Sequence, residues 1–192
     1  MDILLVISKL DGSCQLFGKD LLTYMLSRLE PTFKVKVFTT DEKIQKRVAD
    51  KLVKASTLME ALDNFSKDKK EFIVITRLAL CDINFDNLIK YHTNHDKKMT
   101  LVCKNFVRNK SIPIYKLNEK KEVTAVTSRR FADCGIYLFK NKVNFKKYKH
   151  IKAVILNMIE NNEVKAFVHK SYWWTSKNIK RRGNGKGTFD RS

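Results

Sequence analysis

Three polar side chains follow the most continuously apolar stretch of the sequence. The run EFIVI, residues 71–75, leads through TRLALC to Asp82, Asn84 and Asp86. Carboxylate and amide oxygens are the usual ligands of hard divalent cations, and open α/β sheets bind ligands beyond the carboxyl ends of their strands. The first acid, however, comes several residues after the apolar run. Two interpretations remain open: a ligand set shifted along the chain, or a loop that caps the following helix.

The histidines and cysteines form no recognisable catalytic or metal-binding motif. His92 and His95 are spaced to share one face of a helix, but no acid or cysteine is spaced to complete a metal site. We interpret them as one family-like helix histidine and one surface histidine. The cysteines lie far apart without a C-x-x-C pair, and we interpret them as reduced core residues. They are Cys14, Cys81, Cys103 and Cys134.

Positive charge is most concentrated at the end of the sequence. The segment from residue 170 onward is KSYWWTSKNIKRRGNGKGTFDRS, and its last dozen residues lack an apolar period. Its stretch RRGNGKGT has neither the spacing nor the flanking elements of a P-loop. Flexible basic arms of this kind commonly follow phosphate backbones. We predict that five basic residues bind a polyanion: Lys177, Lys180, Arg181, Arg182 and Lys186.

Aromatic residues directly precede this basic arm. Tyr172 and Trp174 could stack on nucleic-acid bases. The alternative is that the tryptophans close the hydrophobic core, which we favour for Trp173 and leave open for Trp174.

Bulk composition limits the possible classes. With 192 residues and 43% hydrophobic residues, the chain can build one sizeable core, and it has no apolar run of the roughly 20 residues that cross a membrane. The start, MDILLVISKLDG, predicts a first strand rather than a secretory signal, so we expect a cytoplasmic protein. The net charge of +19 favours nucleic acid, an acidic protein or an anionic membrane surface. A lysine-rich proteome would produce the same excess without any partner.

Strand and helix patterns alternate along the chain. Strands are expected at 2–8, 33–40, 71–76, 98–106, 133–139 and 163–169, with a hairpin over 112–128. Helices are expected at 18–30, 39–55, 56–65, 84–95 and 148–162. This order predicts a three-layer α/β fold with a mixed, mainly parallel sheet and helices on both faces. We expect one domain over 1–175 and a flexible basic tail over 176–192.

Four segments, taken in order, resemble the sugar-phosphate nucleotidyltransferases, which join a nucleoside triphosphate to a sugar 1-phosphate. They are FGKDLLTYMLSRL, CDINFDNLIKYHTNHDKKMTLVCKN, YKLNEKKEVTAVTSRRFADCGIYLF and VILNMIENNEVKAFVHKSYWW. The second is most similar to the glucose-1-phosphate adenylyltransferase branch. The resemblance covers most of residues 1–175 and implies the fold of the nucleotide-diphospho-sugar transferases.

The resemblance also implies catalytic groups that this sequence lacks. In the family a glycine-rich loop wraps the triphosphate with backbone N–H groups, whereas SKLDGSCQLFGKD contains only Gly12 and Gly18. The metal-binding aspartate after the central strand aligns with Leu78 or Ala79. The second metal aspartate, which follows the family's tryptophan, aligns with Thr175.

The family's Glu-Lys pair, which holds the sugar and its phosphate, aligns with Ser128 and Arg129. The glycine-rich loop, both metal-binding aspartates and the Glu-Lys pair of the family are all replaced. We therefore predict a catalytically inactive relative without metal or cofactor. It would act as a binding, regulatory or assembly module for a polyanion or an acidic protein. Two alternatives stay open. One is a divergent metal-dependent nucleotidyltransferase or glycosyltransferase using Asp82 and Asp86. The other is a basic nucleic-acid-binding protein unrelated to transferases, which a structure without a parallel central sheet would favour.

Overall fold

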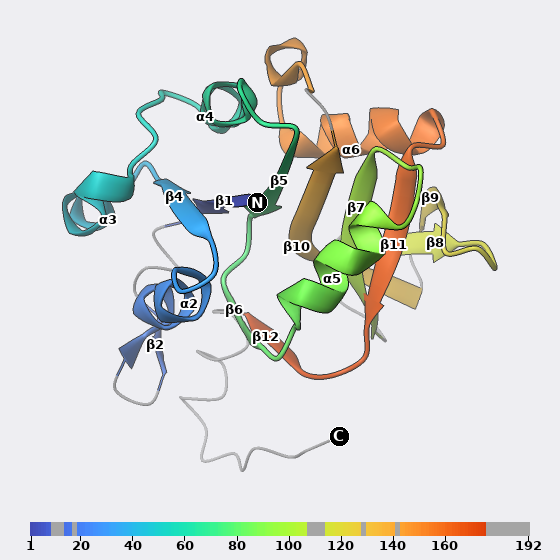
Figure 1. Cartoon of the computed structure of the whole chain (residues 1–192), viewed down its shortest axis with the longest axis horizontal. Helices are drawn as coiled ribbons and strands as arrows, with labels where there is room; N and C mark the ends of the chain where they lie inside the picture. Colours follow the sequence, from blue (N-terminus) through green and yellow to red (C-terminus); the bar gives the residue numbers. More distant parts are fainter. Residues whose placement is uncertain (9–13, 17–18, 107–113, 128–129, 141–142, 176–192) are drawn as a thin grey trace.

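The computed structural model describes residues 1–8, 14–16, 19–106, 114–127, 130–140 and 143–175. A twisted sheet forms the middle layer, and helices cover both of its faces (Figure 1). Within these ranges, no helix is both long and apolar enough to span a membrane.

The main sheet is mixed and mainly parallel. Its main path among the described residues runs β11-β7-β10-β5-β1-β4, and only β10 runs antiparallel to its neighbours β5 and β7. These strands are β1 (Asp2–Val6), β4 (Lys34–Phe38), β5 (Glu71–Ile75), β7 (Met99–Phe106), β10 (Arg130–Lys140) and β11 (Val164–His169). The predicted fold class is confirmed, and the unrelated nucleic-acid-binding alternative loses the observation that would have favoured it.

Alternating residues of the central strands feed two separate cores. In β1, Ile3 and Leu5 pack on one face, and Leu4 packs on the other. β5 repeats this division, because neighbouring side chains of a strand point to opposite faces. A strand buried on both faces must be apolar at every position, which accounts for the uninterrupted run EFIVI.

Each core is closed by its own helices. α2 (Leu21–Leu29), α3 (Glu42–Arg47) and α5 (Phe85–Thr93) contribute buried residues to the first core. α4 (Leu58–Ser66) and α6 (Ile151–Glu160) contribute to the second.

One predicted helix is much shorter than expected. The pattern over 39–55 predicts a single helix, but α3 ends at Arg47 and a 3-10 turn, η1 (Ala49–Lys51), follows it. The chain then extends alongside β4: Leu52 bridges to Val37, and the Val53 amide donates to the Val37 carbonyl at 2.8 Å. Backbone pairing with the edge strand therefore overrides the helical period.

Short strands complete the fold. The predicted hairpin is β8 (Ile114–Leu117) and β9 (Val123–Thr127), joined to β10 through β8. Two short pairs were not predicted: β2 (Gln15–Leu16) with β3 (Lys19–Asp20), and β6 (Ala79–Cys81) with β12 (Trp173–Thr175). A further short 3-10 helix is η2 (Phe145–Lys147).

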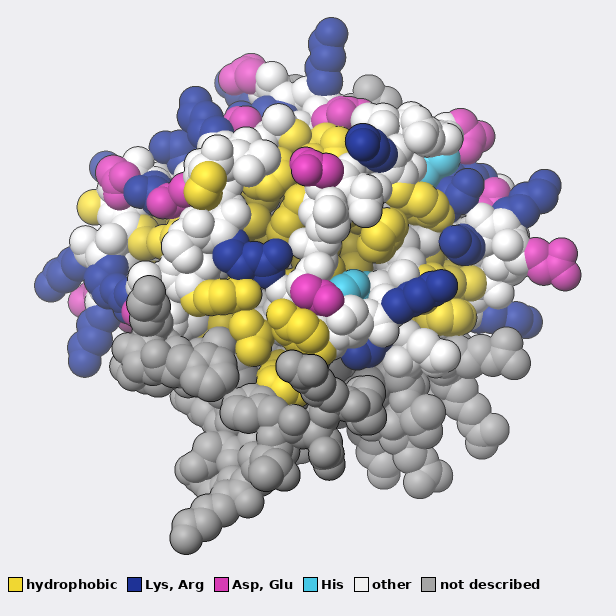
Figure 2. Space-filling view, turned by 60° about the horizontal axis from the view of Figure 1, so that its bottom comes forward, with side chains coloured by type: hydrophobic (Ala, Val, Ile, Leu, Met, Phe, Trp, Pro, Cys, Tyr) yellow, Lys and Arg dark blue, Asp and Glu magenta, His cyan; other side chains and the backbone are white. Residues whose placement is uncertain are grey.

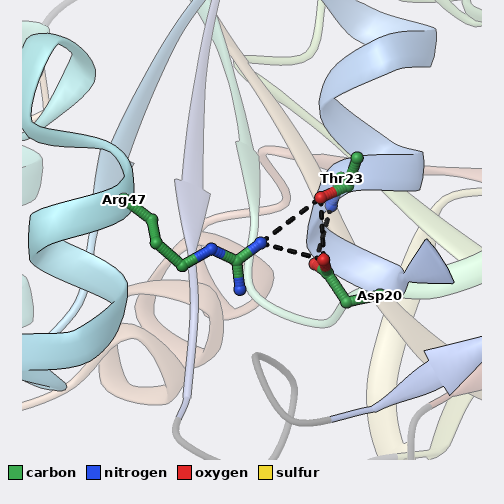
Figure 3. A network of polar contacts seen from close by, with 3 residues as sticks. All are labelled: Asp20, Thr23 and Arg47. Atoms are coloured by element: carbon green, nitrogen blue, oxygen red, sulfur yellow. Dashed lines mark hydrogen bonds and ion pairs between the residues drawn. The ribbon is translucent and has the colours of Figure 1, made fainter.

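A polar network fixes the start of α2 against α3 (Figure 3). The Asp20 carboxylate caps α2 by accepting from the Thr23 amide at 2.9 Å and from the Thr23 hydroxyl at 2.8 Å. Arg47 donates to the same carboxylate at 2.9 Å. Burial alone would raise the pKa of Asp20, but these hydrogen bonds and the charge of Arg47 leave that pKa below its usual value.

Candidate functional site

The antiparallel pair of β6 and β12 lies beyond the carboxyl end of β5. In its register Thr175 is directly opposite Ala79, with Trp174 opposite Leu80. Directly opposed residues in such a pair have Cβ atoms about 5 Å apart, close enough for two carboxylates to share one cation. The structure thus brings together the two positions that the resemblance assigns to metal-binding aspartates. In this chain Ala79 and Thr175 occupy these positions in place of the two aspartates.

The residues at this position do not fit a divalent cation. Ala79 has no side-chain donor, and Leu78, the other candidate position, is fully buried in the first core. Across the described part of the chain, no three His, Cys, Asp or Glu side chains gather where they could hold a metal ion.

A buried carboxylate that the sequence reasoning missed lies close by. Asp133, on β10, is 3% exposed. Its carboxylate accepts hydrogen bonds from the Tyr137 hydroxyl at 2.7 Å, the Tyr115 hydroxyl at 3.2 Å and the Gly135 amide at 2.6 Å. Burial raises the pKa of Asp133, and the nearby positive charge of Arg77 opposes that effect. An acid enclosed in this way is a structural group rather than an open ligand.

The space beside Asp133 is filled by the chain itself. Gly135 has φ +70°, and a Cβ at this position would lie 2.9 Å from the Arg77 Cγ and 2.9 Å from the Thr76 Oγ1. The Thr76 amide donates to the Gly135 carbonyl at 2.8 Å. Thus the end of β5 and the irregularity in β10 are in direct contact. The sequence signal for this contact was a single charged residue within each of two apolar stretches, the Arg of TRLAL and the Asp of FADCG.

The three polar residues that follow the central strand have separate roles. Asp82 lies 3.2 Å from His169, measured from Oδ1 to Nε2. Asn84 is the N-cap of α5 and accepts from the Asn87 amide at 2.9 Å. Asp86 is exposed in the first turn of α5. This arrangement agrees with the loop-and-cap interpretation.

Arg28 of α2 holds this loop from the other side. Its guanidinium donates to the Cys81 carbonyl and, at 3.3 Å, to the Ile83 carbonyl. His169 additionally lies 3.0 Å from the Tyr172 carbonyl oxygen. Contacts from α2 and β11 therefore position both the loop after β6 and the segment that enters β12.

The aromatic residues divide between core and surface. Trp173 packs against the first core, as expected. Tyr172 is 40% exposed, and its ring centroid lies 5.9 Å from that of the partly exposed Trp174 at a tilt of 48°. In Figure 2, hydrophobic side chains gather on the face turned toward the viewer, with Lys and Arg side chains around them.

Comparisons with known proteins agree with this architecture. No protein-family model and no curated protein matches the sequence. Among solved structures, a protein assigned as a glucose-1-phosphate thymidylyltransferase from Bacillus anthracis has a TM-score of 0.73 at 10% identity, covering 99% of this chain and 97% of its own. HddC from Yersinia pseudotuberculosis has a TM-score of 0.67 at 16% identity, covering 94% and 99%. The chain has a nucleotidyltransferase-like fold.

A third nucleotidyltransferase-like structure is the synthetase for CMP-2-keto-3-deoxy-manno-octonic acid complexed with CTP. Its TM-score is 0.63 at 10% identity, and the match covers 88% of this chain and 90% of that one. At such identities the similarity shows the fold alone. The adenylyltransferase branch and the loss of activity therefore remain inferences from the residues.

Several predicted site residues lie outside the described residues of this nucleotidyltransferase-like chain. They are Gly12, Gly18, Ser128, Arg129 and the five tail residues Lys177, Lys180, Arg181, Arg182 and Lys186. Their roles stay predictions.

His92, in the last turn of α5, and His95, just after the helix, form a polar cluster with Thr100. Thr100 offers one hydroxyl to both rings, 2.7 Å from His92 Nδ1 and 2.8 Å from His95 Nε2. Burial, followed by the charge of Lys140, lowers the pKa of His92 to about 3 and that of His95 to about 4. The sequence led us to expect one surface histidine in this pair, whereas His92 is buried and His95 is partly buried.

Proposed function

We propose that the chain is a catalytically inactive nucleotidyltransferase-like protein that acts as a binding module for single-stranded nucleic acid. The observation that carries the loss of catalysis is the cross-strand pair of Ala79 and Thr175. Transfer to a triphosphate needs a divalent cation to neutralise the phosphate charge. One hydroxyl and one methyl group cannot replace two carboxylates in that role.

Neighbouring groups do not supply the missing ligands. The Asp133 carboxylate already accepts three hydrogen bonds and is nearly inaccessible. Asp82 faces His169, and Asn84 caps a helix. A cation that entered this region would have to displace existing contacts of each group.

Thermal unfolding tests the inactive state. A ligand that binds the folded chain raises its melting temperature, so we expect no shift with Mg²⁺ or Mn²⁺ together with ATP, CTP, GTP or dTTP. In the double variant Ala79→Asp and Thr175→Asp, two opposed carboxylates should lower the melting temperature, and Mn²⁺ should restore it. The variant Ala79→Asn with Thr175→Asn, which introduces no charge, is the matched control.

The enzyme alternative rests on Asp82, whose side chain is 41% exposed, and on the exposed Asp86. A metal-dependent shift with a triphosphate in the wild-type chain would reject the inactive state. If that shift disappeared in Asp82→Asn and Asp86→Asn, the divergent transferase would replace our proposal.

Charge and aromatic surface support nucleic acid as the partner. The exposed ring of Tyr172 lies beside the partly exposed ring of Trp174, directly before the predicted basic arm. Aromatic side chains stack on unpaired bases regardless of sequence, and basic residues neutralise phosphates. The two kinds of contact predict different salt responses.

Fluorescence anisotropy with a labelled single-stranded RNA measures both contacts. Removing three arm charges, in Lys180→Ala with Arg181→Ala and Arg182→Ala, should reduce the slope of log K against log salt by about 2. Replacing Tyr172 and Trp174 by Ala should weaken binding by about 1–3 kcal/mol per lost stacking contact while keeping the slope.

Three exposed lysines near the start of α6 provide the charge control. These are Lys147, Lys149 and Lys152, which carry the same total charge as the three arm residues. Their replacement by Ala should change RNA binding less than the arm variant does. Equal losses in both variants, or RNA binding that no variant alters, would contradict the proposed site.

A further inference from the structure

The outer strand of the β8–β9 hairpin has one strand partner. Among the described residues, β9 pairs with β8, and apart from a single bridge between Glu122 and Lys165 nothing pairs with its other side. Figure 1 places the hairpin at the margin of the molecule, beyond β11. Within the described part of the chain, the backbone of residues 124–127 therefore forms an open strand edge.

This edge has little of the usual protection. Natural proteins generally guard open edges with lysine, proline or a bulge that turns the edge away. The strand VTAVT has no charge, no proline and no glycine, although 31% of the whole chain is charged. Its register against β8 shifts at Thr124, between the pairs Lys116–Ala125 and Leu117–Val123, but residues 125–127 beyond this shift pair regularly. Val126, at 41% exposure, and Thr124 face solvent from this strand.

The hairpin is held rigidly from behind. Val123 is buried in the second core together with residues of α6. The turn is closed by the Asn118 amide, which donates to the Glu122 carbonyl at 3.1 Å, and by an ion pair of Glu122 with Lys97 at 3.0 Å. A rigid edge loses little conformational freedom when another strand pairs with it.

We propose that the free edge of β9 binds an extended acidic segment of a partner protein by strand addition. Lys120 and Lys121 directly precede β9, and both are exposed. Lys116, opposite Ala125 on β8, is exposed as well. Acidic residues at the end of an added strand that lies beside these lysines would meet their charges, while its backbone supplies the ladder hydrogen bonds.

A second copy of the chain is a poor occupant of the same edge. Because Lys116, Lys120 and Lys121 gather near the start of β9, parallel self-pairing would place like charges side by side. Each copy also carries a net charge of +19. Glu119 and Glu122 offset only part of the local charge, and Glu122 is already paired with Lys97.

The test uses the full chain and a synthetic peptide of alternating Val and Thr with two Glu at each end. Anisotropy of the labelled peptide should show binding that weakens with salt and falls at least about tenfold for Val126→Glu. A peptide with N-methyl groups on both edges cannot donate ladder hydrogen bonds and should not bind. Amide hydrogen exchange should slow at residues 124–127 when the unmodified peptide is added.

Two variants separate edge pairing from general charge. Asn64→Glu makes the same charge change on the exposed surface of α4 and should leave peptide binding unchanged. Val126→Thr keeps a β-branched residue and should retain it. Binding of the doubly N-methylated peptide as tight as that of the unmodified one, or no binding of the unmodified peptide, would overturn the proposal. A concentration-dependent dimer abolished by Val126→Glu would assign the edge to a second copy instead. None of these outcomes involves Tyr172 or the Ala79–Thr175 pair, so the proposed function is tested separately.

Discussion

The Arg77 guanidinium donates a hydrogen bond to the Asp133 main-chain carbonyl at 2.7 Å, joining the end of β5 to β10. In this position Arg77 lies beside a buried carboxylate that two tyrosines and a backbone amide also contact. The carboxyl edge of the central strands is therefore closed by an internal polar cluster.

Removing the Asp133 carboxylate should destabilise the fold strongly. Asp133→Ala leaves the Tyr137 hydroxyl and the Gly135 amide buried without their partner, at about 1–3 kcal/mol for each unsatisfied group. Asp133→Asn retains an acceptor and a similar volume, so it should lose clearly less. Urea unfolding followed by circular dichroism measures both variants, and equal stability losses would show that the hydrogen bonds are unimportant.

Gly135 should not tolerate a side chain. Gly135→Ala combines a positive φ with 2.9 Å contacts from Cβ to Arg77 and Thr76, and we expect a loss of about 1–3 kcal/mol. Asn162, which follows α6 with φ 55° and is exposed, provides the contrast. Asn162→Gly relieves a mildly strained conformation and should be neutral or slightly stabilising. A tolerated Gly135→Ala would indicate that the junction can relax.

Mild acid should weaken the fold through the histidine pair. Above pH 6.5, the ordinary pKa of histidine, His92 is neutral in both the folded and unfolded chains. Between pH 6.5 and about 3, the unfolded chain binds a proton that folded His92 does not, so the free energy of unfolding decreases as pH falls. The slope approaches about 1.4 kcal/mol per pH unit for this group.

Unfolding titrations from pH 7 to pH 4 measure this effect. His92→Gln should flatten the pH dependence even if it lowers stability at neutral pH. His150→Gln removes an exposed histidine outside the pair and should leave more of the slope in place. An unchanged slope in His92→Gln would mean that other groups cause the acid sensitivity.

The helix cap that Asp20 forms should contribute more to folding stability than the ion pair of Asp20 with Arg47 (Figure 3). Asp20→Ala removes the acceptor for the Thr23 amide and should cost about 1 kcal/mol. Asp20→Asn keeps a capping oxygen and loses only the charge interaction with Arg47, whose side chain is 44% exposed, so its cost should stay below about 1 kcal/mol. Arg47→Ala should resemble Asp20→Asn, and thermal denaturation can rank the three variants.

Local patterns predicted most elements well. The alternation in FKVKVFTT and the continuous run EFIVI identified β4 and β5, because the number of buried faces is written into the apolar pattern. The start of α4 shows the limit of such reading. Ser56 and Glu60 are one residue too far apart for a capping box, but Thr57 supplies the cap while Glu60 reaches back to the Ser56 amide.

The sequence by itself determined which residues are missing: a carboxylate at position 79 or 175 is absent whatever the fold. Only the tertiary structure decided that these two positions lie opposite each other, since β6 and β12 are separated by about half of the chain and are too short to carry a pattern. The same reason hid Asp133 and Arg77, whose contact depends on β10 running beside β5. Residue identities and local patterns can be taken directly from the sequence. Contacts between distant segments depend on packing, which no local period encodes.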